Sequence, residues 1–73
     1  MENIIKKYRL KKGLTQDELA KKTGIFRDNI SRYENHYANM RSETCFRFCE
    51  CLDIPVEEFI AWQYKNYKEN KHE

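Results

Sequence analysis

The chain has 73 residues, of which 40% are hydrophobic and 36% charged, with a formal net charge of +2 at pH 7, and this length excludes a large enzyme with a separate substrate domain. Glycine and proline are scarce (Gly13, Gly24 and Pro55), which favours helices joined by short turns over a β-rich fold. No apolar run is long enough to span a membrane and the N-terminus lacks a signal-peptide core, so we expect a soluble, cytoplasmic protein.

The first predicted helix spans residues 3–12. Ile4, Ile5 and Tyr8 form one apolar stripe at helical spacing, and lysines occupy the outside. Gly13 ends this helix.

A capping box predicts the start of the second helix. Glu18 stands three residues after Thr15, so each side chain can bond the backbone N–H of the other residue. This helix should end near Thr23 and Gly24, because glycine readily adopts the positive φ of such an end.

The third predicted helix follows at once, over roughly residues 27–34, with Ile30 and Tyr33 on its inner face. Two helices joined by a short turn that contains glycine form the DNA-reading helix-turn-helix. The following loop is rich in asparagine, and Asn35 is expected to carry the turn that ends the helix.

The fourth predicted helix spans Ser42 to Leu52. Cys45, Phe48, Cys49 and Leu52 lie at the spacing of a core-facing stripe. Cys45, Cys49 and Cys51 lie close together with His36 upstream, but two of these cysteines belong to the core stripe and are not available for the four-ligand set of a structural zinc site. We therefore expect core packing with no metal and no other cofactor.

The last predicted helix begins at Pro55, and Val56, Phe59 and Ile60 are expected to close the core. An apolar stripe then continues into the C-terminal segment through Ile60, Tyr64 and Tyr67. This stripe is either a dimer surface or part of a frayed tail that folds back on the domain.

Charge is distributed unevenly between the two halves of the chain. Residues 1–41 contain ten Lys or Arg against five Asp or Glu, a net charge of +5, and residues 42–73 contain four against seven, a net charge of −3. The basic half contains the helix-turn-helix, which favours a polyanionic partner, although a lopsided solvated surface gives the same count.

Over about residues 5–60 the chain resembles Cro/repressor-type (XRE-family) helix-turn-helix domains. The resemblance is carried by KKGLTQDELA at 11–20, GI at 24–25, ISRYEN at 30–35 and LDIPVEEFI at 52–60. It implies an all-α, compact five-helix bundle of the lambda-repressor-like type, in which the second and third helices form the helix-turn-helix. The expected division is a DNA-binding domain over residues 1–61 and a helical extension or frayed tail over 62–73.

The outward residues at the start of the third helix are expected to read base edges in the major groove. They are Arg27, Asp28, Asn29 and Arg32. An arginine can fork onto guanine and an asparagine can pair with adenine, whereas Asp28 either accepts from cytosine or holds a neighbouring arginine. The alternative is that these residues form an ordinary solvated helix face that does not contact DNA.

Phosphate contacts are expected on both sides of that helix. The resemblance assigns Gln16 to a backbone phosphate, which agrees with the anion preference of a helix N-terminus. Tyr37, Asn39 and Arg41 are expected to contact neighbouring phosphates. Lys or Arg is commoner in this loop among members of the resembled family, so the two neutral residues predict a shallower salt dependence than theirs.

Two further positions bear on the third helix. The resemblance pairs Arg9 with Glu34 in a structural salt bridge, the alternative being two unrelated surface charges. Phe26 stands where relatives place a Ser or Thr cap, and a phenylalanine cannot cap. We expect it to pack on the turn, with contact to a thymine methyl as the alternative.

No nucleophile with a base partner, phosphate-cradling loop or paired-carboxylate pocket is present, so no enzyme is expected. We expect a small transcriptional regulator, acting as a repressor, that binds a pseudo-palindromic operator as a homodimer. The rival is a protein-interaction module, an antitoxin or adaptor, that uses the same fold or the aromatic C-terminal tail.

Overall fold

The computed structural model describes residues 3–35 and 40–70, and this part of the chain forms five α-helices and no strand. The helices are α1 (Ile4–Lys11), α2 (Gln16–Thr23), α3 (Arg27–Asn35), α4 (Ser42–Leu52) and α5 (Val56–Asn70). The first four lie within one residue of their predicted bounds, and the all-α, five-helix architecture is confirmed.

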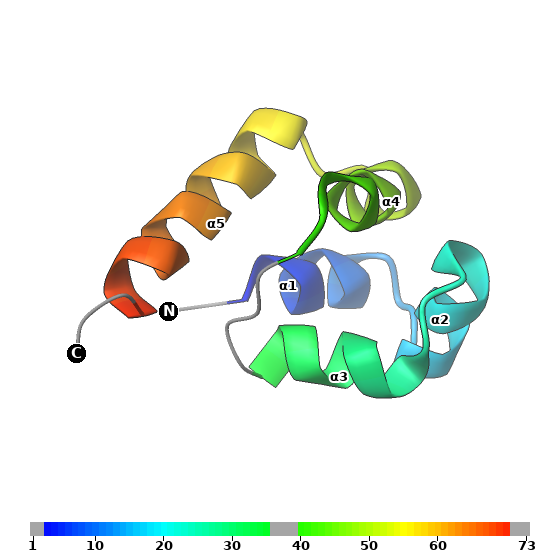
Figure 1. Ribbon diagram of the computed structural model, residues 1–73. Coiled ribbons are helices and arrows are strands. Elements are labelled where there is room, and N and C mark those ends of the chain that lie inside the picture. The colour runs from blue at the N-terminus through cyan, green and yellow to red at the C-terminus, as the bar shows by residue number, and fades with distance from the viewer. Residues whose placement is uncertain (1–2, 36–39, 71–73) are drawn as a thin grey trace.

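The helices pack around α1 and α4 (Figure 1). In that view α1 lies at the centre, α3 runs below it and α4 above it, and α2 closes one end of the molecule. α5 packs against α4 and extends along the other side of the molecule, away from α2. The second and third helices, adjacent in sequence, also pack against each other.

Every helix contributes to one core. The six fully buried large side chains are Ile5, Leu19, Ile30, Phe48, Leu52 and Phe59. The predicted core stripe of α4 is buried throughout, including the thiols of Cys45 and Cys49. Burial raises the pKa of both thiols because a low-dielectric surrounding disfavours the thiolate.

Three residues with positive φ separate the helices. Gly13 (φ 70°) and Gly24 (φ 75°) follow α1 and α2 as predicted. Asp53 (φ 56°) ends α4 and is the one non-glycine residue of this kind in the described ranges, a conformation that aspartate tolerates better than most residues. The carboxylate of Asp53 also forms an ion pair with Lys12, which ties the end of α4 to the end of α1.

The packing of α5 differs from the expectation. Val56 and Ile60 are 42% and 56% exposed, so they do not close the core. Phe59 is fully buried, and because adjacent residues are 100° apart around a helix, Ile60 turns away from the core. The inner face continues instead to Trp62, whose ring packs edge to face against Phe59 with the ring centres 5.7 Å apart. Ile54, in the short link between α4 and α5, is also buried in the core.

α5 runs without a break through the expected domain boundary to Asn70. Tyr8 of α1 donates through its hydroxyl to a carboxylate oxygen of Glu58 at 2.7 Å, which fixes the first turn of α5 to the domain. Farther along, Ile60, Tyr64 and Tyr67 are all exposed, at 56%, 62% and 41%. Within the described residues, no helix is both long enough and apolar enough to cross a membrane.

Candidate nucleic-acid interface

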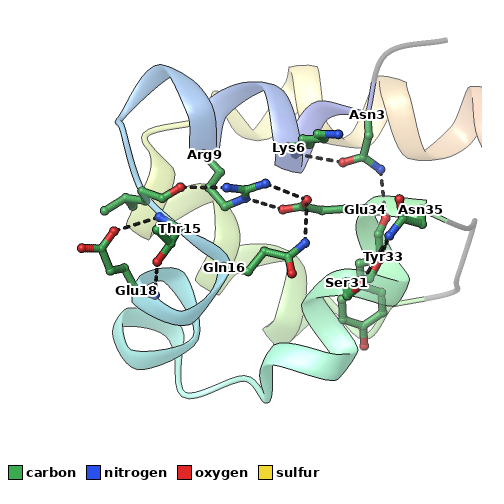
Figure 2. A network of polar contacts seen from close by, with 11 residues as sticks. Asn3, Lys6, Arg9, Thr15, Gln16, Glu18, Ser31, Tyr33, Glu34 and Asn35 are labelled. Carbon is green, nitrogen blue, oxygen red and sulfur yellow. Dashed lines mark hydrogen bonds and ion pairs between the residues drawn. The ribbon is translucent and has the colours of Figure 1, made fainter.

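The predicted capping box begins α2. Thr15 Oγ1 accepts from the N–H of Glu18 at 3.0 Å, and the Glu18 carboxylate accepts from the N–H of Thr15 at 2.8 Å (Figure 2). The backbone bond lowers the pKa of Glu18, since an N–H donor favours the charged carboxylate. α2 ends at Gly24, in the left-handed conformation, so both ends of this helix are fixed by local sequence.

Arg47 of α4 holds the turn between α2 and α3. Its Nη1 donates to the carbonyl oxygen of Thr23 at 3.0 Å, and its Nη2 donates to Glu43 at 2.8 Å. The Thr23 hydroxyl in turn donates to the carbonyl of Leu19 and accepts from the N–H of Ile25. Sequence inspection missed Arg47, because a long cation outside the apolar stripe of a helix resembles an ordinary solvated side chain.

A buried ion pair connects α1 to α3. Arg9 and Glu34 meet in a forked arrangement, with Nε to Oε2 at 2.7 Å and Nη2 to Oε1 at 3.0 Å (Figure 2). Their side chains are 10% and 2% exposed. The bond to Glu34 raises the pKa of Arg9, and Arg9 Nη1 also donates to the carbonyl of Leu14 at 2.8 Å. α3 is therefore held in a fixed orientation on α1.

Gln16 joins this ion pair. Its Nε2 donates to Glu34 Oε1 at 3.1 Å, so the side chain bridges the first turn of α2 to the last turn of α3 (Figure 2). An amide nitrogen has two hydrogens. One is committed to Glu34, and the second remains chemically suited to a phosphate oxygen. Sequence reasoning expected the phosphate contact but not this internal bond.

Three of the four expected base-reading residues of α3 are exposed. The side chains of Arg27 and Asp28 are 58% and 94% exposed; Arg32 is exposed and Asn29 half-buried. Arg27 Nε lies 3.5 Å from the Asp17 carboxylate on α2, whereas its Nη2 lies 4.0 Å from Asp28. Asp17, which the sequence did not single out, is thus the closer partner of Arg27, and Asp28 extends into solvent.

Arg32 is supported by an aromatic neighbour. Its guanidinium carbon lies 5.1 Å from the ring centre of Tyr33, a cation–π distance. Tyr33 packs edge to face on the buried Phe48 at 5.9 Å. The buried Phe48 thus positions Tyr33, and Tyr33 in turn restricts where the Arg32 guanidinium lies.

Arg41, an expected phosphate contact, is exposed immediately before α4 and makes no side-chain cap there. The expected contacts Tyr37 and Asn39 lie outside the described residues. Asn35, expected to form the turn after α3, is the last residue of that helix, and its amide donates to the carbonyl of Ser31 at 2.8 Å (Figure 2).

The expectation for Phe26 was wrong. The residue does not pack on the turn: it is 80% exposed, the most exposed of the large hydrophobic side chains in the described residues. The residue of the turn that packs against the core is its neighbour Ile25, whose N–H donates to the Thr23 hydroxyl.

The net positive charge of residues 1–41 lies largely outside the helix-turn-helix itself. Residues 16–35 contain four Lys or Arg and four Asp or Glu, a net charge of zero. The surplus comes chiefly from the lysines of residues 4–12 and from Arg41. A polyanion would therefore meet α3 through individual side chains more than through a strongly basic surface.

No three His, Cys, Asp or Glu side chains gather to hold a metal ion in the described ranges. Cys45, Cys49 and Cys51 are free thiols.

The helix-turn-helix family model matches residues 5–59 of the chain. The chain is 39% identical over 56 residues to the antitoxin HipB of Escherichia coli K12, an alignment of 77% of this chain and 64% of HipB. It is 29% identical over 63 residues to an HTH-type transcriptional regulator of Methanocaldococcus jannaschii, covering 86% and 96% of the two chains. A regulator of Archaeoglobus fulgidus is 31% identical over 62 residues, covering 85% and 89%.

The chain thus spans about three fifths of the length of the antitoxins it matches. No solved structure matches it at a comparable level of significance. The family and the regulator relatives agree with the prediction that the chain is not an enzyme.

Proposed function

The chain belongs to the XRE-type helix-turn-helix family, and from that premise we propose that it is a sequence-specific double-stranded DNA-binding protein that represses transcription in the cytoplasm. The proposal rests chiefly on one observation. α3 is anchored through the buried Glu34, while Arg27, Asp28 and Arg32 on the same helix project into solvent. A rigid helix that exposes hydrogen-bonding side chains is what major-groove reading requires.

The proposed contacts divide into base reading and positioning. Arg27 and Arg32 would each fork onto guanine, and Asn29 would pair with adenine. Asp28 would accept from cytosine N4, since it extends into solvent and its nearest cation is 4.0 Å away. Each well-placed pair of this kind typically changes discrimination by about 1–3 kcal/mol.

Positioning contacts would come from Gln16 and from the residues before α4. Gln16 lies at the N-terminal turn of α2, where N–H groups lacking helical partners favour an anion. Its second amide hydrogen would donate to a phosphate while the first stays on Glu34. Arg41, with Tyr37 and Asn39, would contact the phosphates on the other side of α3.

We propose that the protein binds as a homodimer. One such domain buries only about 600–1,000 Å² on DNA, which gives limited affinity for a single half-site. Two copies would place their α3 helices about 34 Å apart, one turn of DNA, on a pseudo-palindromic operator. The exposed stripe of Ile60, Tyr64 and Tyr67 on α5 is the proposed dimer surface. Repression would follow from occlusion of the promoter.

The test is selection of bound sequences from randomised duplex DNA at near-physiological salt. The proposal expects enrichment of an inverted repeat, lost in the double variant Arg27→Ala, Arg32→Ala. The matched control is Lys21→Ala, Lys22→Ala, which removes the same charge from exposed positions of α2. The control should weaken binding to every sequence about equally and keep the preference. Failure to enrich any sequence would refute the proposal.

A second candidate function is protein interaction as an antitoxin or adaptor, which the likeness to antitoxin HipB favours. Salt separates the two functions, because contacts to phosphates weaken steeply as salt rises and an aromatic protein interface does not. Asp28→Ala adds a second criterion: unchanged DNA affinity and preference would argue against base reading at α3.

A further inference from the structure

Phe26 occupies the N-cap of α3. Its carbonyl oxygen accepts from the N–H groups of Asn29 and Ile30, both at 3.0 Å, so Phe26 forms the first hydrogen bonds of the helix while standing just before it. An N-cap side chain lies over the end of the helix. That end, in this class of motif, contacts base edges.

The residue contributes little that would stabilise the domain. A phenyl ring has no acceptor for the N–H groups that open the helix, so α3 lacks the side-chain cap that Thr15 gives α2. At 80% exposure the ring also buries little apolar surface in return. A local rule broken without a compensating contact is typical of a functional position.

The ring is also the one exposed large hydrophobic side chain of the described residues that lies in the helix-turn-helix. The remaining exposed large hydrophobic side chains of the described residues lie on α1, α4 and α5, and none lies on α2 or α3. Phe26 is instead followed directly by the exposed Arg27 and Asp28. A lone ring among polar side chains is too small for a protein-docking patch but matches a single apolar group on a base edge.

We propose that Phe26 is a specificity-determining residue that contacts the C5 methyl group of a pyrimidine in the major groove, a role that rests on the DNA-binding function proposed above. Thymine presents such a methyl beside polar acceptors, and 5-methylcytosine presents the same group. Arg27 and Asp28 then read the polar edges of neighbouring bases, and Phe26 adds preference for a methyl-bearing base at one position of each half-site.

The experiment replaces single thymines by uracil in the selected operator, which removes the methyl and leaves base pairing intact. Wild-type protein should bind about fourfold more weakly for each half-site so altered, the effect of one apolar carbon removed from contact. Phe26→Ser should bind the thymine and uracil operators equally. A second set of duplexes carries cytosine or 5-methylcytosine at the same position and determines which of the two methyl-bearing bases is preferred.

Two controls keep the result interpretable. Phe46→Ser removes another exposed phenylalanine, 55% accessible on α4, and should leave the thymine-to-uracil ratio unchanged. Phe26→Ser supplies the missing cap, so its melting temperature should rise by about 4–8 °C, which excludes misfolding as the cause of lost discrimination.

The outcomes separate this inference from the proposed function. An operator that is selected but bound equally with thymine and uracil, and equally with cytosine and 5-methylcytosine, at every position overturns the role of Phe26 and leaves sequence-specific binding intact. A methyl preference that persists in Phe26→Ser overturns it as well. Selection that enriches no sequence overturns both proposals together.

Discussion

Replacement of Arg9 by methionine should destabilise the domain more than replacement of Glu34 by glutamine, although both changes break the same ion pair. In Arg9→Met the Glu34 carboxylate stays in the interior, 2% exposed, with the Gln16 amide as its remaining side-chain donor. In Glu34→Gln the Arg9 guanidinium keeps its hydrogen bond to the carbonyl oxygen of Leu14, and it can still donate to the side-chain oxygen of the new glutamine.

The magnitudes follow from these environments. Removing one partner of a buried, hydrogen-bonded ion pair costs about 3–5 kcal/mol, and Arg9→Met should show this full loss. Glu34→Gln conserves shape and one acceptor, so we expect a loss of about 1–2 kcal/mol. A domain of this size has a free energy of unfolding of roughly 4–11 kcal/mol, so Arg9→Met removes a large share of it.

Urea unfolding followed by far-ultraviolet circular dichroism at one protein concentration measures both losses. With a slope near 1 kcal/mol/M, the midpoint should fall by about 3 M or more in Arg9→Met and by about 1–2 M in Glu34→Gln. The control is Lys12→Met, which breaks the exposed pair with Asp53 and should cost less than about 1 kcal/mol. Equal losses in the two test variants, or a loss in Arg9→Met no greater than the control, would refute the reasoning.

Three further predictions concern α2 and its ends. Thr15→Ala should cost about 1 kcal/mol in urea unfolding, and Thr15→Ser should restore most of it. The pKa of Glu18 lies below its usual 4.5 in the folded state, so the stability that this carboxylate contributes is present above about pH 4.5 and is lost as the pH falls. In Glu18→Gln the free energy of unfolding, measured by urea unfolding at a series of pH values, should therefore fall less steeply below about pH 4.5 than in the wild type. Gly24→Ala should lower the melting temperature more than Gly13→Ala, since both positions have positive φ but a Cβ at Gly24 would lie 3.3 Å from Arg47 Nη1; equal shifts would contradict this.

The helix-turn-helix was predictable because its signals are local. The capping box at Thr15 and the glycine at Gly24 fix α2 within a few residues of sequence, and both are present in the structure. The pairing of Arg9 with Glu34, 25 residues apart, came from the family resemblance, since spacing alone does not indicate which distant charges meet.

The rest depended on tertiary packing. The rotation of α5 buries Phe59 and exposes Ile60, and a pattern in which both are apolar does not determine which one faces inward. The bonds from Arg47 to the turn and from Gln16 to Glu34 each join separate helices. Phe26 was misjudged because large apolar residues are usually buried, whereas this one is 80% exposed and its neighbour Ile25 packs against the core instead.

One face of α3 packs against the rest of the domain, and the opposite face is exposed to solvent. The inward positions Ile30 and Glu34 are buried and fixed by the rest of the domain. The outward positions, among them Asp28 and Arg32, are exposed, and changes at such positions usually alter the free energy of unfolding by less than about 0.5 kcal/mol. Under the proposed function, successive substitutions on that face would change the preferred DNA sequence, in evolution or by design, without a loss of folding between one specificity and the next.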